Sequence, residues 1–515
     1  MPTPAPRARP PATAPDTTDK HAPRRGLRLV AAGDRTGPAG KVLGHTTIGR
    51  RTPAGISLAD ARQHLQVLGP TGTGKSTLLT HMAVEEAKAG RGIAVLDPKG
   101  DLVRGILDQL PADCGDRLVL IDPDDEEAWP AINLLDLTAS PPNSGAAYRA
   151  AGSATAVMGQ LWARWWGHRS ADIAYHAALT LAHDPNGTLG QMSRLLTDHP
   201  WRRGVVAGVR SRLGPLREGT LGEFWGTWDQ MPSGARLAVA APLLAKLRAV
   251  LGHPLPAGLF GLPRTTFRFE QILDGGILLA RLPKDDIGLD TARLVGSMLT
   301  TGLIHAAGAR ARQPESARLD ATVILDEAHN FLHLPIGVDD ALAELRGFHV
   351  SLVLAHQYVN QLTKPMQDAV DGNARNKIFF NLGPRDAKEM VGHVHPYLDE
   401  QDLRRLGAYT IVLRAIADSR PIPPVTLHTF PRSPVIPGRA DALRRAARAN
   451  TGIPASIREK LYVPPAVADL LALDDTLDQT DEPLAPSALF SADGPPYGDT
   501  VTNPSTAWDS DTEPW

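Results

Sequence analysis

A glycine-rich segment at residues 64–79 contains the residue types that hold a polyphosphate. Its centre reads Gly-Pro-Thr-Gly-Thr-Gly-Lys-Ser, the spacing of a phosphate loop between an apolar run and a helical pattern. Glycines let successive backbone amides converge on one anion, and the helix behind them adds a positive dipole. Lys75 would contact the β- and γ-phosphates, and the Ser76 hydroxyl would bind Mg²⁺. We therefore expect ATP and Mg²⁺ as cofactors, bound by Gly69, Pro70, Thr71, Gly72, Thr73, Gly74, Lys75, Ser76 and Thr77.

An acidic pair follows a second apolar run, at Asp326 and Glu327. One carboxylate can bind Mg²⁺ while the other polarises the water that attacks the γ-phosphate, so we assign Asp326 to the metal and Glu327 to the base. Exposed strand ends often carry acids, so this assignment depends on the phosphate loop. The long separation from Lys75 predicts an inserted domain.

Three later polar residues are further candidates for the site. Gln357 follows the run 351–355 and would sense the γ-phosphate, with a solvated strand end as the alternative. Arg375 and Arg385 are candidates for an arginine that acts in trans, and surface or ion-pair roles are the alternative for both. The predicted catalytic residues are Lys75, Glu327, Gln357 and Arg385. The charged turn at 97–101 receives no catalytic role, and Cys114 and the histidines lack metal-ligand spacing.

Short apolar runs alternate with helical patterns and predict an α/β fold with a parallel central sheet. Several runs are continuously apolar, as in parallel strands that are covered on both faces. Helical patterns such as 77–88 and 289–310 lie between them. The expected strands are 65–69, 93–97, 118–121, 277–282, 322–325, 351–355, 377–382 and 410–413.

Composition divides the chain into six segments. The segment 143–270 is rich in Ala, Leu and Arg with helical spacing, which predicts an all-α insertion domain. It divides the α/β domain into two parts, 26–142 and 271–435. Outside these we expect disorder at 1–25, a basic helical segment at 436–460 and an acidic disordered tail at 461–515.

The overall composition limits the classes of protein to consider. The 515 residues are 42% hydrophobic and 21% charged, with a net charge of −2, which is typical of a soluble globular protein. Contact with DNA would need a local basic surface. The single cysteine is consistent with the cytoplasm. No apolar run is long enough to span a bilayer, so we expect no intrinsic membrane span, with peripheral recruitment to a membrane left open.

Taken together, these segments resemble the HerA/FtsK branch of P-loop motor ATPases, and within it the TraG/TraD-type coupling proteins of conjugative transfer. The resemblance covers about residues 40–460. In the motor it is carried by 64–79, 97–101, 121–123 with Asn133, 326–328, 355–357 with 361–362, and 386–387; in the insertion it is carried by 166–167, 188–198, 224–225 and, beyond it, 277–288.

The resemblance implies a RecA-like motor that assembles as a homo-oligomeric ring, usually a hexamer. ATP would lie between subunits, and its hydrolysis would move DNA through the channel, with the helical insertion at one mouth. Relaxase or secretion-channel proteins would be partners. Two departures matter: membrane-anchored members have N-terminal transmembrane helices that this sequence lacks, and residues 379–381 read Phe-Phe-Asn where many relatives have an arginine.

The leading hypothesis is therefore an ATP-driven DNA translocase, or coupling protein, of conjugative or mobile-element transfer. One alternative is a secretion ATPase of the same branch that moves protein. Another is a nucleotide-gated adaptor that recruits a nucleoprotein substrate with little turnover. Stimulation of ATPase activity by DNA distinguishes the first of these from the others.

Overall fold

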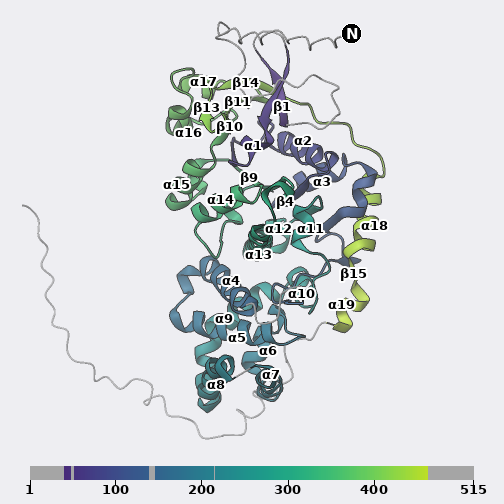
Figure 1. The fold of residues 1–515 in the computed structure, drawn as a ribbon, viewed down its shortest axis with the longest axis vertical. Helices are drawn as coiled ribbons and strands as arrows, with labels where there is room; N and C mark the ends of the chain where they lie inside the picture. Colours follow the sequence, from purple (N-terminus) through teal and green to yellow (C-terminus); the bar gives the residue numbers. More distant parts are fainter. Residues whose placement is uncertain (1–39, 48–50, 139–144, 214, 462–515) are drawn as a thin grey trace, which may run out of the picture. The chain divides into compact units, whose positions relative to one another are not determined.

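The sheet at the centre of the fold has eleven strands, in the order β2-β1-β14-β11-β10-β3-β9-β8-β4-β7-β5 (Figure 1). The computed structural model describes residues 40–47, 51–138, 145–213 and 215–461, so the segment 1–25 and the tail beyond 461 lie outside it. From β10 to β5 all neighbours are parallel, whereas β11, β14, β1 and β2 pair antiparallel. The strands are β1 Gly40–Thr46, β2 Pro53–Ser57, β3 Leu65–Leu68, β4 Gly92–Asp97, β5 Leu118–Ile121, β7 Ile277–Arg281, β8 Ala321–Leu325, β9 Val350–His356, β10 Asn376–Phe379, β11 Thr410–Arg414 and β14 Val425–Thr429.

Both faces of the parallel strands are buried, and alternate residues enter different cores. In β4, Ala94 and Leu96 belong to one apolar cluster, whereas Ile93 and Val95 belong to another. The first cluster includes α13 and helices of the insertion, and the second includes α2 and α3. The helices of the sheet-bearing part are α1 Leu58–Ala61, α2 Lys75–Lys88, α3 Asp101–Leu107, α11 Phe269–Leu273, α12 Lys284–Ile287, α13 Leu289–Ala309, α14 Val338–Gly347, α15 Lys364–Asn373, α16 Pro384–Met390 and α17 Glu400–Arg404.

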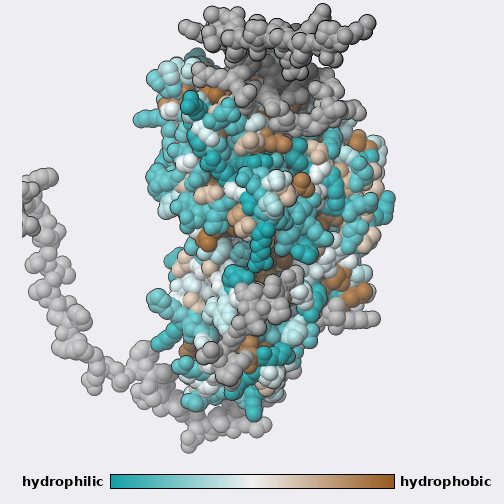
Figure 2. All heavy atoms as spheres, viewed as in Figure 1, coloured by the Kyte–Doolittle hydropathy of each residue, from teal (hydrophilic) through white to brown (hydrophobic). Residues whose placement is uncertain are grey.

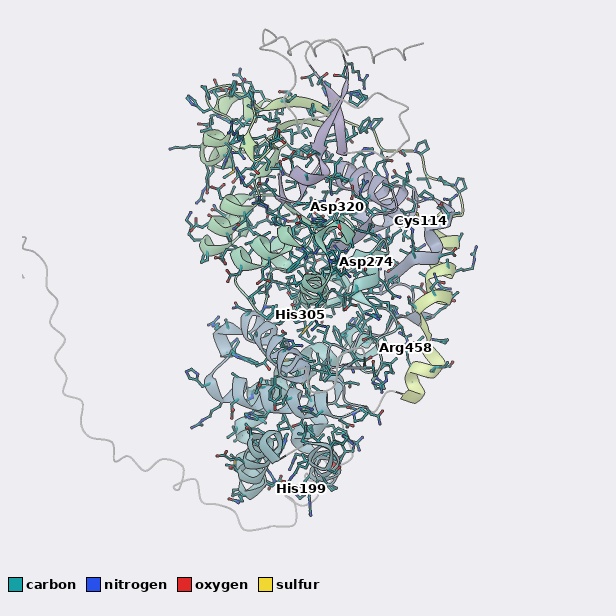
Figure 3. All side chains as sticks on the ribbon, viewed as in Figure 1. Cys114, His199, Asp274, His305, Asp320 and Arg458 are labelled. Carbon is teal, nitrogen blue, oxygen red and sulfur yellow. The ribbon has the colours of Figure 1, made fainter. Side chains whose placement is uncertain are left out.

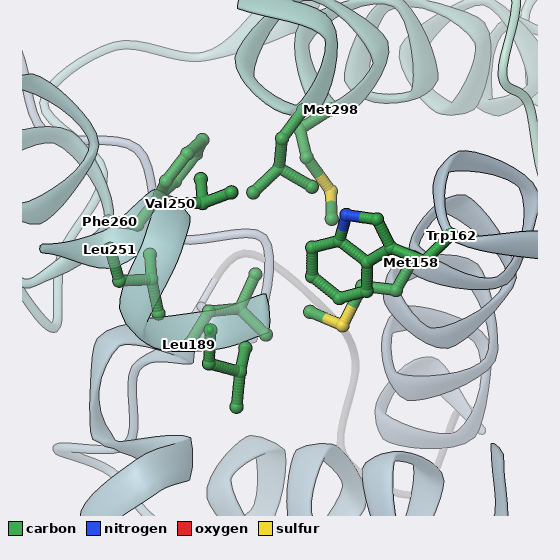
Figure 4. Close-up of a pocket in the computed structure, with 9 residues that line it drawn as sticks. Met158, Trp162, Leu189, Val250, Leu251, Phe260 and Met298 are labelled. Atoms are coloured by element: carbon green, nitrogen blue, oxygen red, sulfur yellow. The ribbon is translucent and has the colours of Figure 1, made fainter. Parts of the chain in front are cut away.

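Between β6 (Ala128–Trp129) and α11, the described residues form helices and no strand. These helices close a small apolar cavity against α13, lined by Trp162, Phe260 and Met298 among others (Figure 4). The boundaries of this insertion as a separate domain stay a prediction. Its α-helices are α4 Ala146–Leu161, α5 His168–His183, α6 Met192–Thr197, α7 His199–Arg212, α8 Pro215–Gln230, α9 Ser233–Leu251 and α10 Pro254–Phe260.

The segment after the sheet folds back onto the edge of the sheet, at β5. Helix α18 (Arg439–Thr451) buries Leu443 in the cluster that contains β5, and its Arg448 pairs with Asp125 at 2.7 Å. Helix α19 (Ala455–Leu461) carries Arg458, which Figure 3 labels. The Arg458 guanidinium lies 4.0 Å from the centre of the Trp129 ring. The predicted basic segment thus contains these two helices, separated by the short strand β15 (Ile453–Pro454), which pairs with β6.

No helix in the described ranges is long and apolar enough to cross a membrane. On the face drawn in Figure 2, hydrophobic residues are scattered among hydrophilic ones.

The fold class predicted from the sequence is confirmed. All eight expected strands are present, within a few residues of their predicted ends, and the parallel order is that of a RecA-like fold. The antiparallel strands β1, β2 and β14 were not predicted.

Candidate nucleotide-binding site

The loop between β3 and α2 has the backbone geometry of an anion-binding turn. Gly72 and Gly74 have φ of 83° and 111°, a region that favours glycine. A Cβ on Gly74 would lie 2.7 Å from the Tyr409 ring, whereas one on Gly72 would meet nothing within 4 Å. Gly74 is the N-cap residue of α2 and makes no side-chain hydrogen bond. The first backbone amides of this helix therefore have no capping side chain as an acceptor. The loop therefore offers open space and backbone donors to an anion.

Lys75 and Asp326 face each other beneath this loop. The Lys75 ammonium lies 3.4 Å from Asp326 Oδ1, and both side chains are buried. Each of these two atoms lacks a hydrogen-bond partner among the described residues. Burial raises the pKa of Asp326. Buried polar atoms are normally paired, so this arrangement fits a ligand that brings both negative phosphate oxygens and a cation.

The donor set fits Mg²⁺ held partly by the nucleotide. The described residues contain no group of three His, Cys, Asp or Glu side chains that could hold a metal. Ser76, exposed at the start of α2, and Asp326 would be the protein ligands, and phosphate oxygens and water would supply the rest. This is how Mg²⁺ is usually bound beside phosphates.

Glu327 is held by hydrogen-bond donors from two segments, the turn after β4 and the turn after β9. Its backbone has φ of 48°, and its carboxylate accepts hydrogen bonds from Lys99 at 2.9 Å, from Gln361 at 3.0 Å and from Gln357. Lys75 lies 3.6 Å away. Burial alone would raise the pKa of Glu327, but Lys75, with the hydrogen bonds of Gln357 and Lys99, outweighs burial and lowers it to about 2. The carboxylate is therefore ionised and fixed in orientation.

Gln357 connects this carboxylate to the phosphate loop. Its side-chain oxygen accepts a hydrogen bond from Thr71 Oγ1 at 3.1 Å, while its nitrogen donates to Glu327. Gln361 supports the same turn, because its oxygen accepts the backbone amides of Gln357 and Tyr358 at 2.7 and 3.0 Å. A γ-phosphate bound at the loop would lie next to these hydrogen bonds from Thr71 through Gln357 to Glu327.

The two candidate arginines lie in different surroundings. Arg375 donates to Gln63 and to the Ser419 carbonyl, each at 2.8 Å, which is a structural role before β10. Arg385 is exposed on α16. Its guanidinium lies within 3.1 Å of the side-chain amide of Asn360, when that amide is turned so that its oxygen accepts hydrogen bonds from the arginine. The structure therefore brings Lys75, Asp326, Glu327 and Gln357 together and leaves Arg385 on the surface.

Three residues in the segments that carry the resemblance make structural contacts outside the phosphate loop. Asp97 accepts the amides of Lys99 and Val103, at 2.9 and 3.0 Å, which fixes the turn into α3. Asp122 forms a buried ion pair with Arg281 at 2.6 Å. The Asn133 side-chain amide donates to the carbonyls of Gly187 and Pro263 at 2.9 Å, which connects the segment after β6 to the helical insertion.

Two residues near the site received no role from the sequence, although one of them, Lys99, lies in the segment 97–101 that carries the resemblance. Lys99 lies in the turn after β4, and it reaches Glu327 because β4 and β8 are neighbours in the sheet. Tyr409 lies against the loop but is distant in the sequence. Residue spacing could not reveal the contact of Lys99 with Glu327 or of Tyr409 with the loop, because both contacts depend on the order of strands in the sheet.

The family model for the central domain of helicase HerA matches residues 41–141, which include the phosphate loop and its helix. A comparison with curated protein sequences finds no match. The sequence of residues 41–141 is therefore similar to that of the HerA central domain.

Solved structures of the plasmid coupling protein TrwB share the fold. The complex with a non-hydrolysable ATP analogue has a TM-score of 0.51 at 16% identity, covering 81% of this chain and 97% of that one. The form with sulphate has a TM-score of 0.51 at 16% identity, and the match covers 82% of this chain and 98% of that one. The complex with ADP and Mg²⁺ has a TM-score of 0.50 at 18% identity, and the match covers 80% of this chain and 97% of that one. The resemblance to the HerA/FtsK branch and to conjugative coupling proteins is confirmed.

Proposed function

We propose that this protein is an ATP-hydrolysing motor that moves DNA in conjugative or mobile-element transfer. The observation that carries the proposal is the ionised, oriented Glu327 beside buried Lys75 and Asp326 at an open phosphate loop. A passive nucleotide sensor needs the loop and its lysine, but it has no need of an oriented carboxylate. TrwB, which shares the fold, has been captured with an ATP analogue and with ADP and Mg²⁺.

The roles of the residues follow from their positions. The loop amides and Lys75 would hold the β- and γ-phosphates, and Ser76 with Asp326 would hold Mg²⁺, which supplies charge neutralisation when bound. Glu327 would orient and polarise the attacking water, and Gln357 would sense the γ-phosphate. Arg385 of a neighbouring copy would complete the site in a ring, which we propose to be a hexamer. The motor would work in the cytoplasm, recruited to a membrane channel or a relaxase.

The deciding experiment measures ATP turnover with single-stranded DNA, with double-stranded DNA and without DNA. A DNA motor increases turnover on DNA, and this stimulation weakens steeply as salt rises, because phosphate contacts release counterions. A mass measurement with and without ATP tests the ring. Equal turnover with and without DNA of every length contradicts DNA translocation and favours a motor for protein, and absence of turnover favours an adaptor.

A further inference from the structure

Tyr409 has an unusual backbone conformation next to the phosphate loop. Its φ is 61°, in the left-handed region that residues other than glycine adopt rarely. Two hydrogen bonds hold it there, from its amide to the Thr73 carbonyl at 2.9 Å and from the Thr429 amide to its own carbonyl at 2.9 Å. The loop and the end of β14 together fix this residue, and strain of this kind concentrates at functional sites.

The side chain of Tyr409 is half exposed although it packs against the loop. Its relative exposure is 48%, and its ring is so close to Gly74 that any side chain at that glycine would collide with it. The ring thus covers the start of α2 with one part and faces solvent with another. Thr71 and Gly72, on the same loop, are also exposed.

Strand order indicates which part of a nucleotide would come near Tyr409. Asp326 and Glu327 follow β8, on one side of β3, so the γ-phosphate and the attacked water belong on that side. On the other side of β3 lie β10 and then β11. Because β11 is antiparallel to β10, its first residues reach the same edge as the phosphate loop. Tyr409, just before β11, therefore lies on the side away from the γ-phosphate.

We propose that Tyr409 binds the nucleobase of the triphosphate by stacking its ring on the base. This inference rests on the proposed function, since it assumes that the loop binds a nucleotide. An aromatic ring held rigidly, half exposed and on the side away from the acidic pair is suited to stacking, because the face of a base adds apolar contact without needing new hydrogen bonds.

The test compares ATP with tripolyphosphate, which has the phosphates but no base. Tyr409→Gly removes the ring and keeps the left-handed backbone, whereas Tyr409→Phe keeps the ring. Tyr397→Ala, which removes another exposed tyrosine, is the matched control. Calorimetric titration of the full chain should show ATP bound roughly ten- to a hundredfold more weakly by Tyr409→Gly, with tripolyphosphate affinity unchanged. Tyr409→Phe and Tyr397→Ala should bind both ligands as the wild type does.

Three results would overturn the inference, and they differ from failure of the proposed function. If Tyr409→Gly binds ATP with wild-type affinity, the ring does not contact the base. If it loses ATP and tripolyphosphate equally, Tyr409 only shapes the phosphate loop. If Tyr409→Phe is as weak as Tyr409→Gly, the hydroxyl and not ring stacking is responsible. A wild-type chain that binds neither ligand contradicts the proposed function itself.

Discussion

The ammonium group of Lys99 lies 2.9 Å from the carboxylate of Glu327, across two neighbouring strands, β4 and β8. Lys75 is the second cation near this carboxylate, at 3.6 Å. Bound phosphates would attract Lys75, which would leave Lys99 as the cation that stays with Glu327. Lys99 is therefore placed to keep the carboxylate oriented during turnover.

Replacing Lys99 by Met should lower kcat about tenfold while the Kd for ATP stays within about twofold, because small misplacements of a catalytic group are costly. Phosphate release and calorimetry measure the two quantities separately. Lys388→Met, on the exposed face of α16, serves as the control. Loss of ATP binding in Lys99→Met would instead make Lys99 a phosphate ligand.

Variants at Lys75 and Glu327 should affect ATP binding and ATP turnover separately. Lys75→Ala removes the buried cation of the loop, so ATP binding should fall by about 100-fold or more. Glu327→Gln keeps the shape of the side chain but removes its charge, so turnover should fall at least about 100-fold with ATP binding nearly unchanged. Glu327→Gln with wild-type turnover would show that another group activates the water.

The carboxylate of Glu86 should make the free energy of unfolding depend on pH in the acid range. This buried carboxylate accepts hydrogen bonds from Arg91 at 2.8 and 2.9 Å and from Thr322 at 3.0 Å. Burial alone would raise its pKa, but Lys41 and Arg91 outweigh burial and lower it from 4.5 to about 2. A lowered carboxyl pKa stabilises the fold above pH 4.5, and this stabilisation is lost as the pH falls toward 2.

The measurement is urea unfolding of the wild type and of Glu86→Gln between pH 7 and the acid limit of folding. At neutral pH the wild type should be more stable by on the order of 3 kcal/mol, and the difference should shrink as the pH falls below about 4.5. Glu85→Gln, at the exposed neighbouring position, should show no such dependence. A difference that stays constant with pH would exclude the titration of Glu86 as its cause.

The parallel part of the fold could be predicted because strands buried on both faces are continuously apolar. Strand β5 shows this pattern, since all of its residues are apolar and buried. Strands β1 and β14 were missed since they carry polar residues among apolar ones, such as buried Lys41, which Glu86 compensates at 3.5 Å. That compensation is a tertiary contact, and no local pattern in the sequence reveals it.

The chemistry of the candidate site was predictable only where one segment contains a whole motif. The phosphate loop and the pair Asp326-Glu327 are motifs of this kind, and the structure brings them together. Lys99 and Tyr409 reach the site through the order of strands, with β4 beside β8 and β11 antiparallel to β10. Only an explicit sheet topology could have assigned them from the sequence.

Arg385 provides the sharpest test of a site shared between copies. Its guanidinium lies beside Asn360, and the next residue, Gln361, donates to Glu327 at 3.0 Å. One short turn therefore contacts both the predicted base and the predicted trans-acting arginine. An arginine that acts in trans belongs to a different copy from the loop it serves, so defects in the two can complement each other.

We expect Arg385→Ala and Lys75→Ala to be inactive alone and to regain ATPase activity when mixed. A site with its loop from the Arg385→Ala copy and its arginine from the Lys75→Ala copy is complete, and equal mixing gives roughly a quarter of such sites in a ring with head-to-tail interfaces. Arg405→Ala, at another exposed arginine, should be active without mixing. If mixing restores nothing although the two variants co-assemble, Arg385 acts within its own copy or only supports the turn through Asn360.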